Sequence, residues 1–420
     1  MNPFSEKPRP MDSFFKSWQQ IYQKPYDKHT VDPYTRTRVI LMNGTEYEAV
    51  WFTHQFQRHV QDNELRRALA LSRRLEQQQQ KVIAALKPSD ETVLEHTIGY
   101  EQLAVDLTAG MAAEEPDPMV KAALDFALLE DFDHLYRYSD LLEQESGERA
   151  EQLVGHYTEI MPGRPTIAEH RHPTDNVRFY IDNKTAHPLT KLHTAIITAA
   201  EQQTMNYYMN ICAAYPTDVG RRLYQEIGLI EEQHVTQYGS LLDPRATMLE
   251  CLLMHEYTEC YLYYSCYMDE SDAHIKRVWE EHFTQEVAHL HAAADLLKKY
   301  EQKDWQQVIP DGNFPKLLKL HENIAYVRGV LGSQANLTSR LENYIDESKL
   351  PADAPFYRFQ QALNTPPEQV PTHFVIQQYM DANGQDYRWQ TAEPPVPALR
   401  DRTQDDITVG RERLARSYMQ

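Results

Sequence analysis

Apolar residues recur every three or four positions through three long stretches of the chain, which is the pattern of amphipathic α-helices. Each stretch is interrupted near its middle by residues that end one helix and begin the next, namely Pro116-Asp117-Pro118, Pro216-Thr217-Asp218 and Asp269-Glu270-Ser271-Asp272. The pattern therefore predicts three helical hairpins, at about 91–145, 188–242 and 245–300.

Acidic residues interrupt these apolar stripes at positions that otherwise face the core. Glu201 lies between Ile197 and Met205 at helical spacing, and Glu231 and Glu256 are flanked by apolar residues in the same way. Burying an unpaired carboxylate costs several kcal/mol, so buried acids are usually paired or bound to a metal ion. The pattern indicates a polar site inside a helical core.

The same order of acids and histidine occurs in each predicted hairpin. An acid is followed 30 positions later by a second acid, and three positions after that by a histidine. A lone Glu-x-x-His is common in helices, but three copies with an upstream acid at one offset form a specific pattern. The candidate metal ligands are Glu101, Asp131, His134, Glu201, Glu231, His234, Glu256, Glu286 and His289.

This spacing has a physical meaning in a hairpin. A helix rises about 1.5 Å per residue, so a chain that climbs about fifteen residues and descends the same number returns to its starting level. Residues three apart share a helix face, so the second acid and its histidine point the same way. The ligands of each hairpin are therefore expected at one level of a bundle.

The rest of the chain is predicted to be less regular. Residues 1–50 look like an arm with a short strand at 38–42, followed by helices near 50–60 and 62–86. The linker 146–187 is rich in proline and long enough to run the length of a bundle.

Beyond residue 300 the sequence predicts helices near 315–331 and 336–346. The many prolines of the last 70 residues indicate an extended arm on the body or on a neighbouring subunit, so a homodimer is one arrangement left open.

Charge and composition narrow the function classes. The net charge of −20 argues against a nucleic-acid surface, and no apolar run is long enough to predict a membrane span. The first residues have no signal-peptide core, so we expect a cytoplasmic protein with its four cysteines reduced. The sequence contains no Gly-rich phosphate loop, Gly-x-Ser-x-Gly or His-Glu-x-x-His motif.

The three hairpins, through their Glu-x-x-His and Asp-x-x-His motifs, resemble the helix pairs of the ferritin-like di-iron carboxylate superfamily, including rubrerythrin-like proteins. The resemblance covers about residues 91–299. It implies an all-α, antiparallel ferritin-like bundle with a dinuclear iron site, or one of manganese. The implied organisation is an N-terminal arm and first helix at 1–60, the bundle at 61–300, and C-terminal helices with a Pro-rich arm at 301–420.

The sequence departs from that family in several respects. It has a third helix hairpin where one site needs two, Asp131 replaces the usual Glu, and no Cys-x-x-Cys pair indicates a rubredoxin domain. The long linker favours a site on the first and second hairpins, whereas glutamate at every acidic position favours the second and third. The remaining hairpin is expected to keep its acids for an unusual cluster or to pair with another subunit.

The resemblance implies an oxidoreductase that activates dioxygen or peroxide, with an unknown substrate and electrons supplied by a partner reductase. Two alternatives stay open: a non-catalytic protein for iron binding or oxidative protection, and a metal-free scaffold whose acids are paired with Arg or Lys.

Several other polar residues are expected to have ordinary roles. Glu130 and Glu259 are expected to face other helices or solvent, and the segment 169–172 is expected to be a solvated loop.

Overall fold

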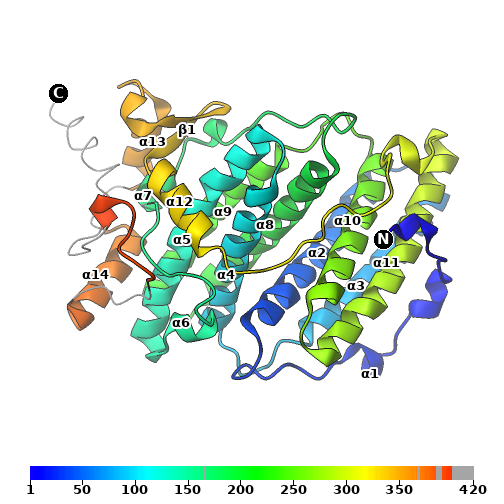
Figure 1. The fold of residues 1–420 in the computed structure, drawn as a ribbon, viewed down its shortest axis with the longest axis horizontal. Coiled ribbons are helices and arrows are strands. Elements are labelled where there is room, and N and C mark those ends of the chain that lie inside the picture. Colours follow the sequence, from blue (N-terminus) through cyan, green and yellow to red (C-terminus); the bar gives the residue numbers. More distant parts are fainter. Residues whose placement is uncertain (165, 365, 367–368, 385–389, 400–420) are drawn as a thin grey trace. The chain divides into compact units, whose positions relative to one another are not determined.

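The structure is a computed structural model that describes residues 1–164, 166–364, 366, 369–384 and 390–399. This part of the chain is predominantly helical, as expected (Figure 1). It divides into two compact units. Unit 1 contains Met1–Glu91, Tyr180–Gln203 and Leu242–Leu320, and unit 2 contains Thr92–Phe179, Thr204–Leu241 and the described residues from His321 onward.

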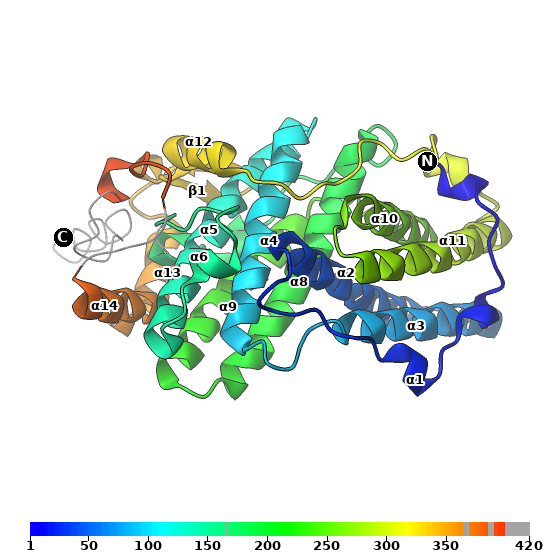
Figure 2. The same cartoon turned by 60° about the horizontal axis from the view of Figure 1, so that its bottom comes forward.

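Four long helices form the body of unit 1: α2 (Pro33–Arg58), α3 (Asn63–Ala84), α10 (Met248–Asp269) and α11 (Ala273–Glu301). Helix α2 packs against α3 and α10, and α11 packs against α10 and α3 (Figure 2). The first part of α8 (Pro188–Ala214) also belongs to this unit, as do the short helices η1 (Pro3–Ser5), η2 (Met11–Phe14), α1 (Trp18–Ile21) and η4 (Trp305–Gln307).

Capping residues fix where the four helices of unit 1 begin. Asp32, Asp62 and Asp272 each accept hydrogen bonds from backbone N–H groups in the first turn of the helix that follows. Thr247 and Glu250 form a reciprocal capping box at the start of α10. These contacts satisfy donors that a helix start would otherwise leave without partners.

Unit 2 is built around helix α5 (Pro118–Ser146), which packs against α4 (Val93–Glu114) and α9 (Asp218–Gly239). Its other elements are α6 (Ala150–Leu153), α7 (Thr166–Glu169), η3 (Pro173–Asp175), the second part of α8, α12 (Ile324–Gln334), β1 (Leu337–Arg340), β2 (Asn343–Asp346), η5 (Glu347–Lys349), α13 (Pro355–Leu363), α14 (Pro371–Asn383) and η7 (Pro397–Leu399).

Helix α5 is enclosed on all sides. Every residue from 123 to 142 is buried, although this stretch includes Glu130, Asp131, Asp133, His134 and Arg137. Polar groups buried in a core need partners, so these side chains require a network inside unit 2.

Three local expectations were wrong. Residues 38–42 lie in the first half of α2 and do not form a strand. This part of the helix is buried on all sides and shows no simple amphipathic pattern. Residues 336–346 form an antiparallel hairpin in which Leu337 pairs with Asp346, not a helix. The predicted C-terminal arm contains α13 and α14, and its residues 400–420 lie outside the described part of the chain.

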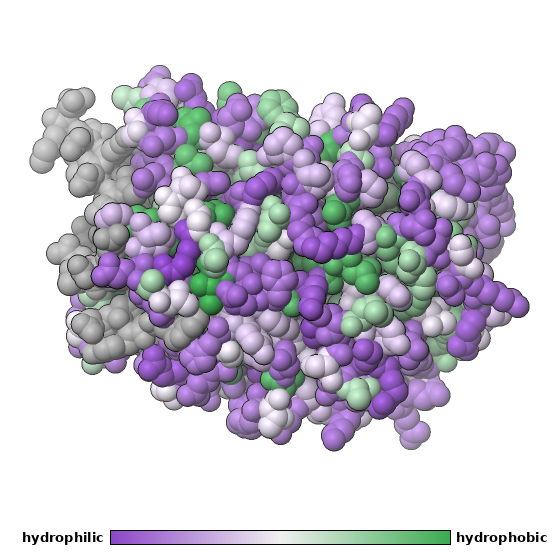
Figure 3. Space-filling model, viewed as in Figure 1, coloured by the Kyte–Doolittle hydropathy of each residue, from purple (hydrophilic) through white to green (hydrophobic). Residues whose placement is uncertain are grey.

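Hydrophilic side chains predominate on the face drawn in Figure 3, and the hydrophobic side chains there lie in small separate groups. Within the described residues, none of the helices combines the length and the hydropathy needed to cross a membrane.

Two candidate metal centres

Buried carboxylates and histidines form a cluster in each unit. In unit 2, Glu101, Asp131, His134 and Glu231 each offer a ligand atom, and these atoms all lie within 4.8 Å of one another. A ligand atom of His234 likewise lies within 4.8 Å of ligand atoms of Asp131 and Glu231. The structure thus brings together five of the predicted ligands, which we call the unit 2 cluster.

Each histidine of the unit 2 cluster has one nitrogen near the cluster and the other near a further buried carboxylate. The Nδ1 atom of His134 lies 3.1 Å from Glu231 Oε1, and its Nε2 atom lies 3.4 Å from Glu169 Oε2. The Nδ1 atom of His234 lies 3.3 Å from Asp131 Oδ1, and its Nε2 atom lies 2.7 Å from Glu130 Oε2. A carboxylate on the outer nitrogen is the usual way in which proteins orient a metal-binding imidazole.

Two arginines hold the outer carboxylate of His234. Arg164 Nη1 donates to Glu130 Oε1 at 2.9 Å, and Arg171 Nη1 donates to the same oxygen. Burial acts to raise the pKa of Glu130, but the Arg171 guanidinium and the His234 ring hold it below its usual range. Glu130 is therefore an anion that fixes the orientation of His234.

These contacts correct two expectations. Glu130 faces another helix, α9, where its Oε2 lies 2.7 Å from His234 Nε2, but it is not exposed to solvent and it also accepts hydrogen bonds from Arg164 and Arg171. The segment 169–172 is not simply a solvated loop, because Glu169, His170 and Arg171 are buried. The sequence did not indicate the roles of Arg164, Glu169 and Arg171. They lie in the proline-rich linker, and no fixed sequence spacing relates this linker to the residues of α5 that it contacts.

Burial and charge set the protonation of the unit 2 carboxylates. Burial raises the pKa of Glu101 well above its usual range, and the negative charges of Glu231 and Asp131 raise it further. Burial also acts to raise the pKa of Glu231, but hydrogen bonds from His134 and His234 lower it to about 2. Burial and neighbouring charges therefore favour the protonated form of Glu101, whereas the two imidazoles favour the ionised form of Glu231.

The unit 1 cluster consists of Glu46, Glu76, Glu256, Glu259, Glu286 and His289. Ligand atoms of Glu76, Glu256, Glu286 and His289 all lie within 4.8 Å of one another, and those of Glu46, Glu76 and Glu259 form a second such group. His289 Nδ1 lies 2.9 Å from Glu76 Oε1 and 3.2 Å from Glu286 Oε2.

The third predicted hairpin is thus neither left over nor the partner of the second hairpin. Its residues Glu256, Glu286 and His289 join Glu46 of α2 and Glu76 of α3 in the same unit. Of the two pairings left open by the sequence, the first and second hairpins do come together, since their acids and histidines form the unit 2 cluster. The third hairpin instead groups with α2 and α3, which precede residue 91.

A sequence signal for this partner hairpin was present. Glu46 lies 30 positions before Glu76, and Gln79 lies three positions after it. Gln79 stands where the other hairpins have histidine, so a search for Glu-x-x-His passes over it. The Gln79 side-chain amide donates to Glu286 Oε1, which places it at the cluster.

Glu259 was expected to face away from the site, and the structure places it in the unit 1 cluster. Burial raises the pKa values of Glu46, Glu256 and Glu259 well above their usual range, and the charge of Glu76 adds to this effect for each. Tyr263 donates a hydrogen bond to Glu46. This cluster is therefore richer in carboxylates and poorer in imidazole than the unit 2 cluster.

Glu201 is the ninth predicted ligand. It is buried on α8, on the part of that helix that belongs to unit 1, and the division between the units falls between Gln203 and Thr204. Its role as a ligand stays a prediction.

Both clusters have a donor set that suits a hard or borderline divalent metal. Carboxylate oxygens and imidazole nitrogens suit iron and manganese. Among the described residues, no Arg or Lys forms an ion pair with Glu46, Glu101, Glu256 or Glu259.

Comparisons of the chain with protein-family models, curated proteins and solved structures find no match.

Proposed function

We propose that the chain is a metal-dependent oxidoreductase of the ferritin-like di-iron carboxylate type, with one dinuclear centre in each unit. Iron is the favoured metal and manganese the alternative. The observation that carries this proposal is the pair of buried carboxylate–histidine clusters, each drawn from helices of one unit. Carboxylates that are buried together without cationic partners are costly unless a metal ion neutralises them.

In unit 2, Glu101, Asp131, His134, Glu231 and His234 would hold the metal, and in unit 1 Glu46, Glu76, Glu256, Glu259, Glu286 and His289 would do so. Bound iron supplies the redox chemistry with dioxygen or peroxide.

The chain itself orients the ligands and controls protons. Glu130 Oε2 lies 2.7 Å from the outer nitrogen of His234, and Glu169 Oε2 lies 3.4 Å from that of His134, so each ring keeps its other nitrogen toward the cluster. Glu101 accepts a hydrogen bond from the Tyr208 hydroxyl, which leaves its second oxygen available to a metal. Burial of these groups keeps bulk water away from the site.

The lack of an Arg or Lys ion pair at Glu46, Glu101, Glu256 and Glu259, among the described residues, also weighs on the alternatives. A metal-free scaffold would need Arg or Lys beside these acids, yet Arg164 and Arg171 pair with Glu130 and Arg137 pairs with Asp133. This arrangement supports a metal site rather than an internal salt-bridge network.

The test is metal analysis of protein expressed with both iron and manganese, followed by turnover assays with dioxygen and hydrogen peroxide. We expect about four iron ions per chain, two for each centre. Oxidant consumption should continue beyond one equivalent of bound iron when an electron donor is supplied. A well-folded protein that retains neither metal would refute the proposal. Iron oxidation that stops after one stoichiometric round would favour an iron-binding protein.

A further inference from the structure

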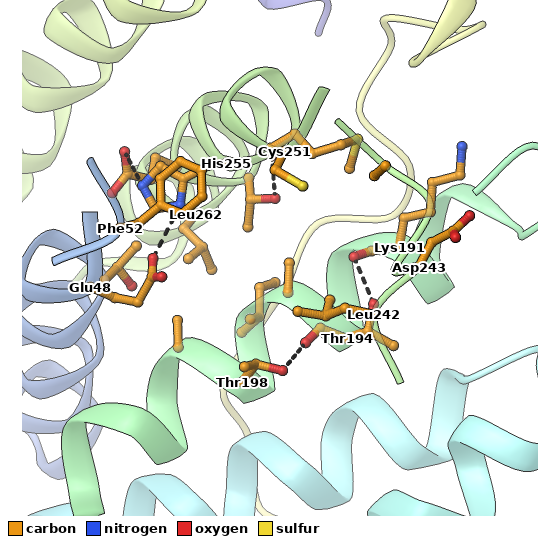
Figure 4. Close-up of a pocket in the computed structure, with 18 of the residues that line it drawn as sticks. Glu48, Phe52, Lys191, Thr194, Thr198, Leu242, Asp243, Cys251, His255 and Leu262 are labelled. Atoms are coloured by element: carbon orange, nitrogen blue, oxygen red, sulfur yellow. Dashed lines mark hydrogen bonds and ion pairs between the residues drawn. The ribbon is translucent and has the colours of Figure 1, made fainter. Parts of the chain in front are cut away.

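Unit 1 contains a cavity of about 190 Å³ between α2, α10 and the first part of α8. Most of its wall is apolar and includes Phe52, Ile196, Leu242, Met254 and Leu262. Figure 4 shows these helices around the open space, with Phe52 and Leu262 on one side and Leu242 on the other.

One part of the cavity wall is also part of the unit 1 cluster. Glu259 lines the cavity, and its carboxylate lies within 4.8 Å of ligand atoms of Glu46 and Glu76. The cavity therefore lies beside the unit 1 cluster, with Glu259 belonging to both.

His255 connects the cavity wall to Glu259. Its Nε2 atom lies 3.4 Å from Glu259 Oε2, its Nδ1 atom lies 3.2 Å from Glu48 Oε2, and its ring stacks on Phe52 (Figure 4). Glu48, His255 and Glu259 all line the cavity. His255 therefore lies between a carboxylate of the cavity wall and one that also belongs to the cluster.

The lining also offers little to an anion. Glu48 and Glu259 at one end provide no positive charge. At the other end, Lys191 and Asp243 have opposite charges, the Lys191 ammonium donates to the Val308 carbonyl oxygen, and Arg245 pairs with Asp243. Transfer of an unpaired charge into such a site is unfavourable.

The size of the cavity limits the molecule that it can hold. An apolar cavity of about 150 Å³ is large enough to bind benzene, so this one has room for a single aromatic ring with a small substituent. Such a ligand would gain from burial against aliphatic and aromatic side chains.

We propose that this cavity is the substrate site of the unit 1 cluster and that it takes a small, neutral, largely apolar molecule of single-ring size. The assignment as a substrate site rests on the proposed function. Binding of the molecule does not depend on it, so the two can be tested separately.

The experiment measures toluene binding to the full chain as purified, by ligand-observed NMR and calorimetry, with benzoate as a charged molecule of similar size. We expect saturable toluene binding, with benzoate at least about tenfold weaker because of its buried charge. Ala199→Phe fills the cavity and should weaken toluene binding by at least about tenfold. Ala213→Phe, on the exposed end of the same helix, should leave it unchanged.

Ala195→Leu is a smaller filling change at another lining residue and serves if Ala199→Phe does not fold. Toluene binding that is absent, or that survives both filling variants, would overturn the inference even if the protein holds iron. Toluene binding that both variants abolish, in a protein that retains no metal, would leave the apolar site standing and defeat the proposed function instead.

Discussion

At the scale of single residues, each histidine of the unit 2 cluster uses its two ring nitrogens differently. One nitrogen lies beside the cluster carboxylates and the other beside Glu130 or Glu169. An anionic partner on the outer nitrogen increases the basicity of the ring and fixes its orientation. In the proposed unit 2 centre, the outer carboxylates would therefore contribute to metal affinity without touching the metal.

Glu130→Gln tests this contribution. It keeps the size of the side chain but removes the charge that faces His234 Nε2, so iron affinity of the unit 2 cluster should fall about 10- to 100-fold. Competition with a chelator measures the change. Asp133→Asn breaks a buried pair with Arg137 on the same helix and should lower stability with less effect on iron. Equal iron affinity in Glu130→Gln and in the unmodified protein would argue against the role of Glu130.

Glu259 allows a test with the metal removed. Burial and the charges of Glu76 and Glu286 raise its pKa, so folding is penalised once the pH rises above the usual value of about 4.5 for the unfolded chain. With a chelator present, Glu259→Gln should therefore raise the free energy of unfolding at pH 7.5 by on the order of 1 kcal/mol. The gain should shrink at pH 5.

Urea unfolding at both pH values measures this difference, with the exposed Glu280→Gln as the control. A variant that is no more stable than the unmodified protein at pH 7.5 would mean that Glu259 is not strained by its neighbours.

The sequence could predict those site residues that recur at a fixed spacing along the chain. It could not predict residues that reach the site only through a contact made in the folded structure. Glu231 and His234 follow from a spacing that occurs three times in the chain. Gln79 interrupts the same spacing because it replaces a histidine, although its amide still reaches Glu286. Arg171 has no spacing signal, since it meets Glu130 only through the path of the linker.

At the scale of elements, the linker after α5 lies directly against that helix. A Cβ atom at Gly163 would come within 2.9 Å of the Leu129 carbonyl oxygen and 3.0 Å of the Asp133 nitrogen. The neighbouring Arg164 reaches Glu130 from this position. The absence of a side chain at residue 163 therefore allows the contacts that orient His234.

Gly163→Ala should push the linker away from α5. We expect a loss of about 1–3 kcal/mol in the free energy of unfolding, because backbone atoms cannot yield as a flexible side chain would. Gly110→Ala is the matched control: a Cβ there meets nothing within 4 Å, and alanine in a helix should stabilise by about 0.5–1 kcal/mol. Urea unfolding distinguishes the two, and a harmless Gly163→Ala would mean that the linker adjusts freely.

Helix positions could be predicted where the sequence marks their ends. The turns at 116–118 and 216–218 lie within a few residues of the observed boundaries, because proline and capping residues act locally. The start of α2 was missed although Asp32 and Pro33 form such a signal, since the buried residues that follow show no amphipathic pattern. The β1–β2 hairpin depends on contacts such as Leu341 with Asp175, which are remote in sequence.

At the scale of the whole chain, the same two offsets occur in four successive helical hairpins. The first, α2–α3, and the last, α10–α11, make unit 1, whereas α4–α5 and α9 of the inner hairpins contribute to unit 2. This nested order explains why the long linker indicated the pairing of the first and second predicted hairpins but not the partner of the third: the two halves of unit 1 are separated in sequence by most of unit 2.

The proposal of one metal centre in each unit predicts that either centre can be lost without the other. His234→Ala removes an imidazole from the unit 2 cluster and His289→Ala removes the single imidazole of the unit 1 cluster, so each should lower iron content by about half. The double variant should hold almost none, and His54→Ala, an exposed position on α2, should change nothing. Iron analysis of the four proteins decides the matter, because a single variant that loses all iron would mean that the two clusters do not bind independently.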